Sequence, residues 1–350
     1  MSASPRLQAV LPGLALAVLT AVIARGVHDL LPEDLQRLFA EVIVAVLLGL
    51  LAGNLLRLPE IFAPGIRFSY QAVLRGAIVL LGASLSFQQV LRIGGKALLM
   101  VSALMIVALL VAHALGRLAR VSSRLSTLIG VGTAVCGNSA IAATAPVIGA
   151  SDAEVSFAIA ANTLFGTAAV FLYPALGHLL GLSSGFFGSW AGMAVNDTSQ
   201  VVATGFAYGD AAGKVATAVK LTRNALMGIV IVVVGLLHGG AAGGARDVPV
   251  ATRVRQSIPS FVLWFLAMAA FNSGGLFTWL SGVVGRSVPD LLQGASRVLI
   301  LVALAGVGLG ARFSTMRAIG LRPFYIGLAT TATTALLGFL LLHVFGPAAG

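Results

Sequence analysis

The stretch GTAVCGNSAIAATAPVIG, residues 132–149, places a cysteine, a glycine and two polar residues in the middle of an apolar run. In lipid every backbone N–H and C=O needs a partner, so unwound backbone survives only inside protein or beside a water-filled cavity. Gly137 supplies the conformational freedom for a break, and Pro146 weakens the helix one to two turns further on. The sequence therefore predicts a membrane helix that breaks at 136–139.

The composition of the whole chain is that of an integral membrane protein. Of its 350 residues, 58% are hydrophobic and 9% are charged, whereas a soluble domain has about 25% charged residues. The formal net charge of +11 is explained by basic residues in cytoplasmic loops. Since no basic patch with interleaved aromatic residues occurs, nucleic acid is excluded as a partner. The single cysteine, Cys136, excludes an internal disulfide.

Apolar runs of roughly 20 residues, the length that crosses a bilayer, predict an all-α polytopic protein of about eleven transmembrane helices. The predicted spans are 9–31, 39–58, 70–91, 97–117, 125–149, 154–182, 186–208, 213–238, 257–281, 290–311 and 323–345. The chain forms a single transporter unit, in which we expect the transport core at about 70–238. The scaffold then comprises 9–58 and 257–345, with part of 290–345 open to assignment to the core.

Basic residues divide unevenly between alternate loops. Twelve fall on the side of the N-terminus: Arg6, Arg57, Arg67, Arg117, Arg120, Arg124, Arg246, Arg253, Arg255, Arg312, Arg317 and Arg322. Six fall on the opposite side: Arg25, Arg37, Arg92, Lys96, Lys214 and Arg286. Because cytoplasmic loops carry the excess of Lys and Arg, we predict a cytoplasmic N-terminus in the inner membrane of a bacterial cell.

The opening stretch has an internal repeat. GTAVCGNSAIAAT (132–144) and GMAVNDTSQVVAT (192–204) match at six of thirteen positions, with the polar tetrads CGNS and NDTS in register. Duplicated transporters place the substrate site at broken helices in corresponding positions, so a second break is predicted at 196–200. A further pair, LGASLS (81–86) and LGARFS (309–314), would be inverted, and the repeat topology stays open. The alternative is that the polar residues only hold packed helices together.

A break creates helix ends in mid-membrane, and the N-terminal end of a half-helix suits an anion. Lys220 and Arg223 are three residues apart and share a helix face, where they would form a cationic wall opposite the tetrads. The alternative for both is that they extend to the membrane edge. The candidate substrate-binding residues are Cys136, Gly137, Asn138, Ser139, Asn162, Asn196, Thr198, Ser199, Gln200, Lys220, Arg223 and Asn224.

Asp197 is the one acid deep inside an apolar run. It is the candidate for binding a coupling H⁺ or Na⁺, or it neutralises Lys220 or Arg223; Glu41 is a poorer candidate. The five histidines are scattered without ligand spacing, so no metal is expected. No nucleotide-binding motif occurs, and no cofactor is expected.

Four segments together resemble the YeiH-like family, which is named for sulfate export: GTAVCGNSAIAATAPVIGA (132–150), FGTAAVFLYP (165–174), AGMAVNDTSQVVA (191–203) and VKLTRNALMG (219–228). The resemblance covers roughly 40–320. It implies a fold of the bile-acid-symporter and sodium/proton-antiporter type, with a core of discontinuous helices and a scaffold domain. It also implies ion-coupled or elevator-like transport. The acidic residues at the sodium sites of related symporters are matched here chiefly by Asp197.

We therefore predict a secondary active transporter that moves sulfate, or an organosulfur or organic anion, by alternating access. An intramembrane enzyme acting through Cys136 or the Asp197–Lys220 pair is one alternative, but an enzyme needs a base near its nucleophile, and none is evident. An anion channel is the other alternative. The expected partners are the substrate anion and the lipid bilayer, with a homo-oligomer left open.

Overall fold

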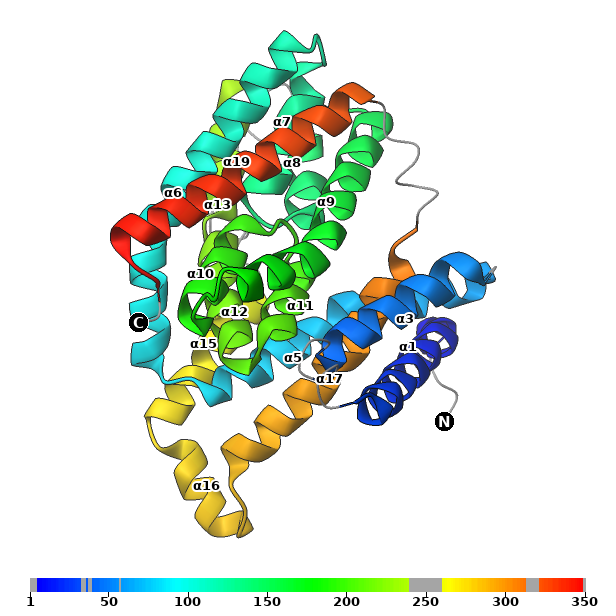
Figure 1. Cartoon of the computed structure of the whole chain (residues 1–350), viewed down its shortest axis with the longest axis vertical. Helices are drawn as coiled ribbons and strands as arrows, with labels where there is room; N and C mark the ends of the chain where they lie inside the picture. The colour runs from blue at the N-terminus through cyan, green and yellow to red at the C-terminus, as the bar shows by residue number, and fades with distance from the viewer. Residues whose placement is uncertain are drawn as a thin grey trace. The chain divides into compact units, whose positions relative to one another are not determined.

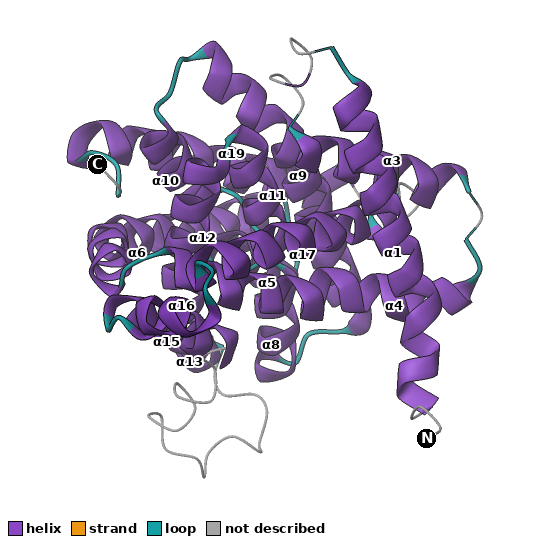
Figure 2. Ribbon diagram, turned by 90° about the horizontal axis from the view of Figure 1, so that it is seen from below, coloured by secondary structure: helices purple, strands orange, loops and turns teal. Residues whose placement is uncertain are grey.

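A computed structural model describes residues 5–32, 36, 40–56, 58–238, 260–312 and 321–348. These residues form helices and turns, and no strand occurs among them (Figures 1 and 2). The helices are α1 (Pro5–Leu30), α3 (Glu41–Leu55), η1 (Glu60–Phe62), α4 (Ala63–Phe68), η2 (Ser69–Val73), α5 (Leu74–Leu81), η3 (Gly82–Ser84), α6 (Phe87–Leu118), α7 (Ser123–Ala134), α8 (Asn138–Ile148), α9 (Asp152–Leu179), α10 (Ser184–Ala194), α11 (Thr198–Tyr208), α12 (Asp210–Ala225), α13 (Met227–Leu237), α15 (Ser260–Ser273), α16 (Leu276–Val284), α17 (Val288–Gly310) and α19 (Leu321–Phe345). The prediction of an all-α polytopic membrane protein is confirmed.

The number of complete spans among the described residues is smaller than the predicted eleven. Seven helical segments are long and apolar enough to cross a membrane, or eight if α15 and α16, which meet at a 70° bend, form one span. The other three predicted spans are α3, with 15 residues, and the pairs α7/α8 and α10/α11, with 11 or 12 residues in each helix. A helix of that length covers about 18 Å, well short of the roughly 30 Å hydrocarbon core.

The predicted loop at 92–96 is wrong. The chain turns at Leu85 and Ser86, where Leu85 has extended backbone angles, and α6 then runs without interruption through Arg92 and Lys96. The adjacent glycines at 94 and 95 do not break it, because a glycine inside a long helix costs only about 1 kcal/mol relative to alanine. Six further basic residues assigned to loops lie outside the described residues: Arg37, Arg57, Arg246, Arg253, Arg255 and Arg317.

The chain divides into two compact units. The first unit comprises Met1–Leu91, Phe206–Gly209 and Leu263–Phe313, and the second comprises Arg92–Gly205, Asp210–Val262 and Ser314–Gly350. Both predicted breaks belong to the second unit. The division of labour between a transport core and a scaffold stays a prediction.

Small residues allow close helix packing in the first unit. α3 packs on α17 and α1 packs on α4, and the buried cluster between them is rich in alanine, including Ala17, Ala45 and Ala305. A Cβ atom built on Gly49 would lie 2.4 Å from the carbonyl oxygen of Ala305. The two backbones are therefore in direct contact, as small residues permit in membrane bundles.

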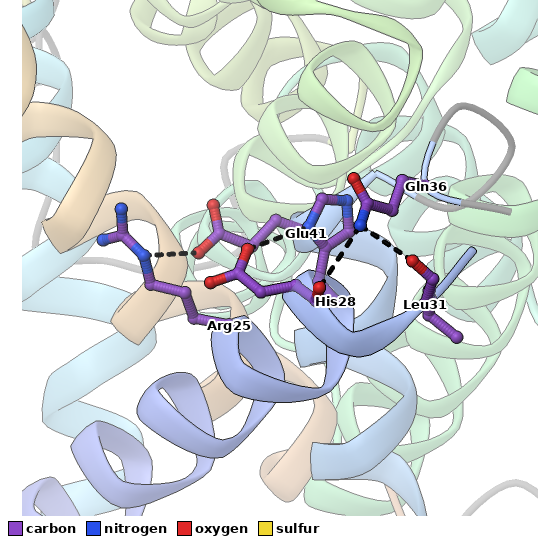
Figure 3. Close-up of polar contacts among 6 residues, drawn as sticks. Arg25, His28, Leu31, Gln36 and Glu41 are labelled. Atoms are coloured by element: carbon purple, nitrogen blue, oxygen red, sulfur yellow. Dashed lines mark hydrogen bonds and ion pairs between the residues drawn. The ribbon is translucent and has the colours of Figure 1, made fainter. Parts of the chain in front are cut away.

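An ion pair connects the end of α1 to the start of α3 (Figure 3). The Nε atom of Arg25 lies 3.7 Å from Oε1 of Glu41. Glu41 is the first residue of α3, where a negative side chain is stabilised by the helix dipole. Glu41, the poorer of the two candidate coupling acids, thus has a partner at a helix terminus in the first unit.

We expect Gly49→Ala to destabilise the protein by about 1–3 kcal/mol, because the added methyl group would overpack the α3–α17 contact. The matched control is Gly26→Ala on α1, where a Cβ atom would meet nothing within 4 Å. Thermal unfolding of the two variants in detergent measures the difference. Equal melting temperatures would contradict the assigned contact.

Candidate functional site

Two pairs of half-helices break at equivalent positions in the second unit. α7 ends at Ala134 and α8 begins at Asn138, while α10 ends at Ala194 and α11 begins at Thr198. The unwound residues are therefore 135–137 and 195–197, slightly earlier than the predicted 136–139 and 196–200. The polar residues that follow each break belong to the first turn of the next helix.

The first break depends on a glycine. Gly137 has φ 69° and ψ −129°, a conformation that residues with a Cβ atom rarely adopt. A Cβ atom at this position would also lie 2.8 Å from Oδ2 of Asp197 and 2.9 Å from its Cα. The two breaks are thus in contact, and four helix ends meet there: the C-terminal ends of α7 and α10 and the N-terminal ends of α8 and α11.

Arg223 binds the C-terminal ends of both preceding half-helices. Its side chain is fully buried, and Nε lies 3.1 Å from the carbonyl oxygen of Ala134. The guanidinium group donates in total to five carbonyl oxygens, those of Thr133 and Ala134 at the end of α7 and those of Gly192, Met193 and Val195 at the end of α10.

Lys220 makes the same kind of contact one turn earlier on α12. Its ammonium group is also fully buried and donates to the carbonyl oxygens of Val135 at 2.8 Å, Val195 at 3.2 Å and Asn196. An ammonium group has three donors, and all three are used. In this conformation Lys220 therefore offers no free donor to an anion.

The last four carbonyl groups of a helix lack intrahelical partners, and the C-terminal end carries a partial negative charge. Lys220 and Arg223 neutralise this charge on both α7 and α10 at once. The alternative that they extend to the membrane edge is wrong, since neither side chain reaches the surface. The geometry makes them caps of the two breaks, and a cationic wall toward a substrate would require them to leave these carbonyl groups.

The N-terminal ends of α8 and α11 differ in their caps. Asp197 caps α11, because its Oδ1 accepts hydrogen bonds from the backbone N–H of Ser199 at 2.9 Å and from its hydroxyl at 2.7 Å. The cap position of α8 is Gly137, with no side-chain cap. Asn138 is half-buried and Ser139 is exposed. The start of α8 is therefore the helix end without a side-chain cap, and its first turn is partly exposed.

Carboxamide side chains surround the breaks. Asn138 accepts from Nδ2 of Asn162 at 2.9 Å and donates to the hydroxyl of Thr163 at 3.3 Å. Gln200 donates to the carbonyl oxygen of Thr163 at 3.2 Å, and Asn224 donates to the hydroxyl of Thr198 at 3.2 Å. The structure thus brings Asn138, Asn162, Thr198, Gln200 and Asn224 together around the breaks, whereas Ser139 is exposed.

Two residues of the site were not predicted. Thr163 connects the two breaks, because Asn138 donates to its hydroxyl and Gln200 to its carbonyl oxygen. The only sequence signal for Thr163 is its position next to the candidate residue Asn162. Met227 places its sulfur 3.4 Å from the thiol of Cys136. Cys136 is buried, and among the described residues its thiol donates to this thioether and not to a base.

The comparisons agree with a membrane protein. A family model described as conserved hypothetical protein 698 matches residues 12–327. A UPF0324 membrane protein of Clostridium tetani is 30% identical over 347 residues, which is 95% of this chain and 97% of that protein. A relative from Brucella melitensis is 32% identical, covering 98% and 93% of the two chains, and one from Streptococcus pyogenes is 37% identical, covering 91% and 92%.

The chain belongs to the UPF0324 membrane protein family. The matched region includes both breaks and both caps on α12, and the relatives are matched over nearly their full lengths. The site therefore lies in the part of the chain that this UPF0324 protein shares with its family. No solved structure matches the chain.

We expect Arg223→Met to destabilise this UPF0324 protein by about 3–5 kcal/mol, the usual cost of removing one partner from a buried charged contact. Lys220→Met should act in the same direction, because three carbonyl oxygens lose their donor. Arg92→Met, at an exposed position of α6, is the control. Unfolding in detergent measures all three, and variants as stable as the control would contradict the capping role.

Proposed function

We propose that this protein is a secondary active transporter that moves a small anion across the membrane by alternating access. One observation carries the proposal: two half-helix pairs from an internal repeat break side by side, and four helix ends converge there. Broken helices of this kind occur in transporters at the substrate site. The fully buried Lys220 and Arg223, which are costly inside a membrane protein, support a functional reason for the breaks.

The N-terminal end of α8 is the proposed anion-binding site. It lacks a side-chain cap, while the equivalent end of α11 is already capped by Asp197. Backbone N–H groups at the start of α8, with the side chains of Asn138 and Ser139, would donate to an oxyanion. The resemblance to YeiH-like proteins favours sulfate or an organosulfur anion among the oxyanions.

Asp197 is the proposed coupling residue. Its Oδ2 atom approaches Gly137, the residue immediately before α8, so a bound anion and this carboxylate would repel one another. A cation bound with the anion, either H⁺ or Na⁺, would relieve the repulsion. Asp197 thereby gives a physical reason for the binding of a cation and an anion to be linked. We place the protein in the inner membrane with a cytoplasmic N-terminus, as the distribution of basic residues favours.

Counterflow of labelled sulfate in proteoliposomes tests the proposal directly. We expect saturable exchange that a sulfur oxyanion, offered among thiosulfate, taurine, sulfoacetate, succinate and chloride, competes away. A conductance far above the turnover of a carrier would instead indicate an anion channel. If folded protein exchanged none of these anions, the transporter assignment would be overturned, and an enzymatic role through Cys136 would have to be examined.

Asn138→Ala and Asp197→Asn should each abolish the exchange and leave the protein folded. Asn caps a helix as well as Asp, so Asp197→Asn removes the charge and keeps the start of α11. Asp152→Asn, at the exposed first turn of α9, is the control. Melting temperatures show whether each variant is folded. Normal exchange by both site variants would mean that the polar tetrads only hold packed helices together.

A further inference from the structure

A narrow crevice lies beside the two breaks, within the second unit. The space between its atoms, counted with the open space at its mouth, is about 170 Å³, but it has no room for a water molecule. Its lining residues are Ile129, Thr133, Ala158, Ala161, Asn162, Phe165, Asn196 and Gly327. The wall is apolar except for Thr133 and the two asparagines, which lie on different elements: α7, α9 and the second break.

Both asparagines carry an unpaired oxygen. Asn162 and Asn196 are buried, with 6% and 1% of their surface exposed, and neither Oδ1 atom has a hydrogen-bond partner. Their nitrogens are already used, since Asn162 donates to Oδ1 of Asn138 and Asn196 donates to the hydroxyl of Thr331 at 3.4 Å. A buried unpaired polar atom costs about 1–3 kcal/mol, so two on one crevice point to a ligand.

The chemistry of these atoms defines what would satisfy them. Carboxamide oxygens only accept hydrogen bonds or coordinate cations, which excludes an anion as their ligand. A bridging water does not fit the crevice. Hard cations take oxygen ligands, including Asn carbonyl groups, and the hydroxyl of Thr133 is a third neutral oxygen on the same crevice. Because all three ligands are neutral, they suit a monovalent ion better than a divalent one.

Charges of both signs lie near this crevice, since Lys220 binds the backbone carbonyl oxygen of Asn196 and Arg223 binds that of Thr133. The carbonyl ends of broken helices are the usual cation ligands in such transporters, but here Lys220 and Arg223 already occupy them. Negative charge is close to the crevice, since a Cβ atom on Gly137 would lie 2.8 Å from both Nδ2 of Asn162 and Oδ2 of Asp197. The crevice therefore combines unpaired oxygens with a carboxylate that offsets part of the positive charge of Lys220 and Arg223.

We propose that Asn162 and Asn196, with Thr133 beside them, bind a dehydrated monovalent alkali cation of the size of Na⁺. This site would identify the coupling ion of the proposed transporter. Its role in transport rests on the proposed function. Binding of the cation itself is a separate property of the folded chain.

The test is the melting temperature of the full-length protein in detergent, in NaCl and in N-methylglucamine chloride at equal ionic strength and equal chloride. A ligand that binds only the folded state stabilises it in proportion to the logarithm of its concentration. We expect the melting temperature to rise with the logarithm of the Na⁺ concentration once the site is filled, and K⁺, which is larger, to have a smaller effect. Equal melting temperatures in Na⁺, K⁺ and N-methylglucamine would overturn the proposal.

Substitutions of the two asparagines test where the cation binds. Asn162→Leu and Asn196→Leu should each remove the Na⁺-dependent increment, whereas Thr330→Val, which removes another buried hydroxyl from α19, should retain it. If the Leu variants fail to fold, Asn162→Asp serves in their place, because the added charge should tighten Na⁺ binding and admit Ca²⁺. An increment that survives in both Leu variants, or an Asn162→Asp protein with unchanged cation response, would place the ion elsewhere.

Direct binding of ²²Na⁺ to the purified wild-type protein separates this proposal from the transporter assignment. Na⁺ binding without anion exchange would leave the cation site standing and remove the proposed function. Anion exchange without Na⁺ binding would support the transporter and overturn the cation site, and H⁺ would then be the coupling ion.

Discussion

The unpaired carbonyl groups at the C-terminal ends of α7 and α10 are the constraint on which the second unit depends. Backbone oxygens left without donors in a membrane protein each cost several kcal/mol. A single helix, α12, resolves this for both breaks, because Lys220 and Arg223 together reach carbonyl groups of both half-helices. The position of α12 is thereby fixed relative to the breaks, and the breaks are fixed relative to each other.

The same ends explain the distribution of charge around the site. Two buried cations oppose the negative ends, Asp197 caps the positive end of α11, and the start of α8 is the end that no side chain caps. The asymmetry arises from one position in the repeat, where glycine in the first tetrad corresponds to aspartate in the second. A duplicated framework thus gives two ends of similar geometry and different electrostatics.

Much of this arrangement could be predicted from the sequence. The rest could not be predicted, for physical reasons. The tetrads identified both breaks, since a cluster of glycine and polar residues inside an apolar run weakens a helix in lipid at that point. Lys220 and Arg223 were recognised as unusual, but their partners are backbone carbonyl groups, which every residue has and which no pattern marks. The loop at 92–96 was misplaced because Arg92 and Lys96 separate two apolar runs, whereas the extended backbone at Leu85 has no comparable signature.

The order of the elements along the chain has a consequence for biogenesis. Lys220 lies 85 residues after its partner Val135 and 25 residues after Val195. A ribosome adding about 5–20 residues per second completes α7 on the order of ten seconds before its capping helix appears. During that interval neither Lys220 nor Arg223 is available to the carbonyl groups of α7, so we expect the nascent half-helix to remain in water or inside the insertion machinery until α12 is made.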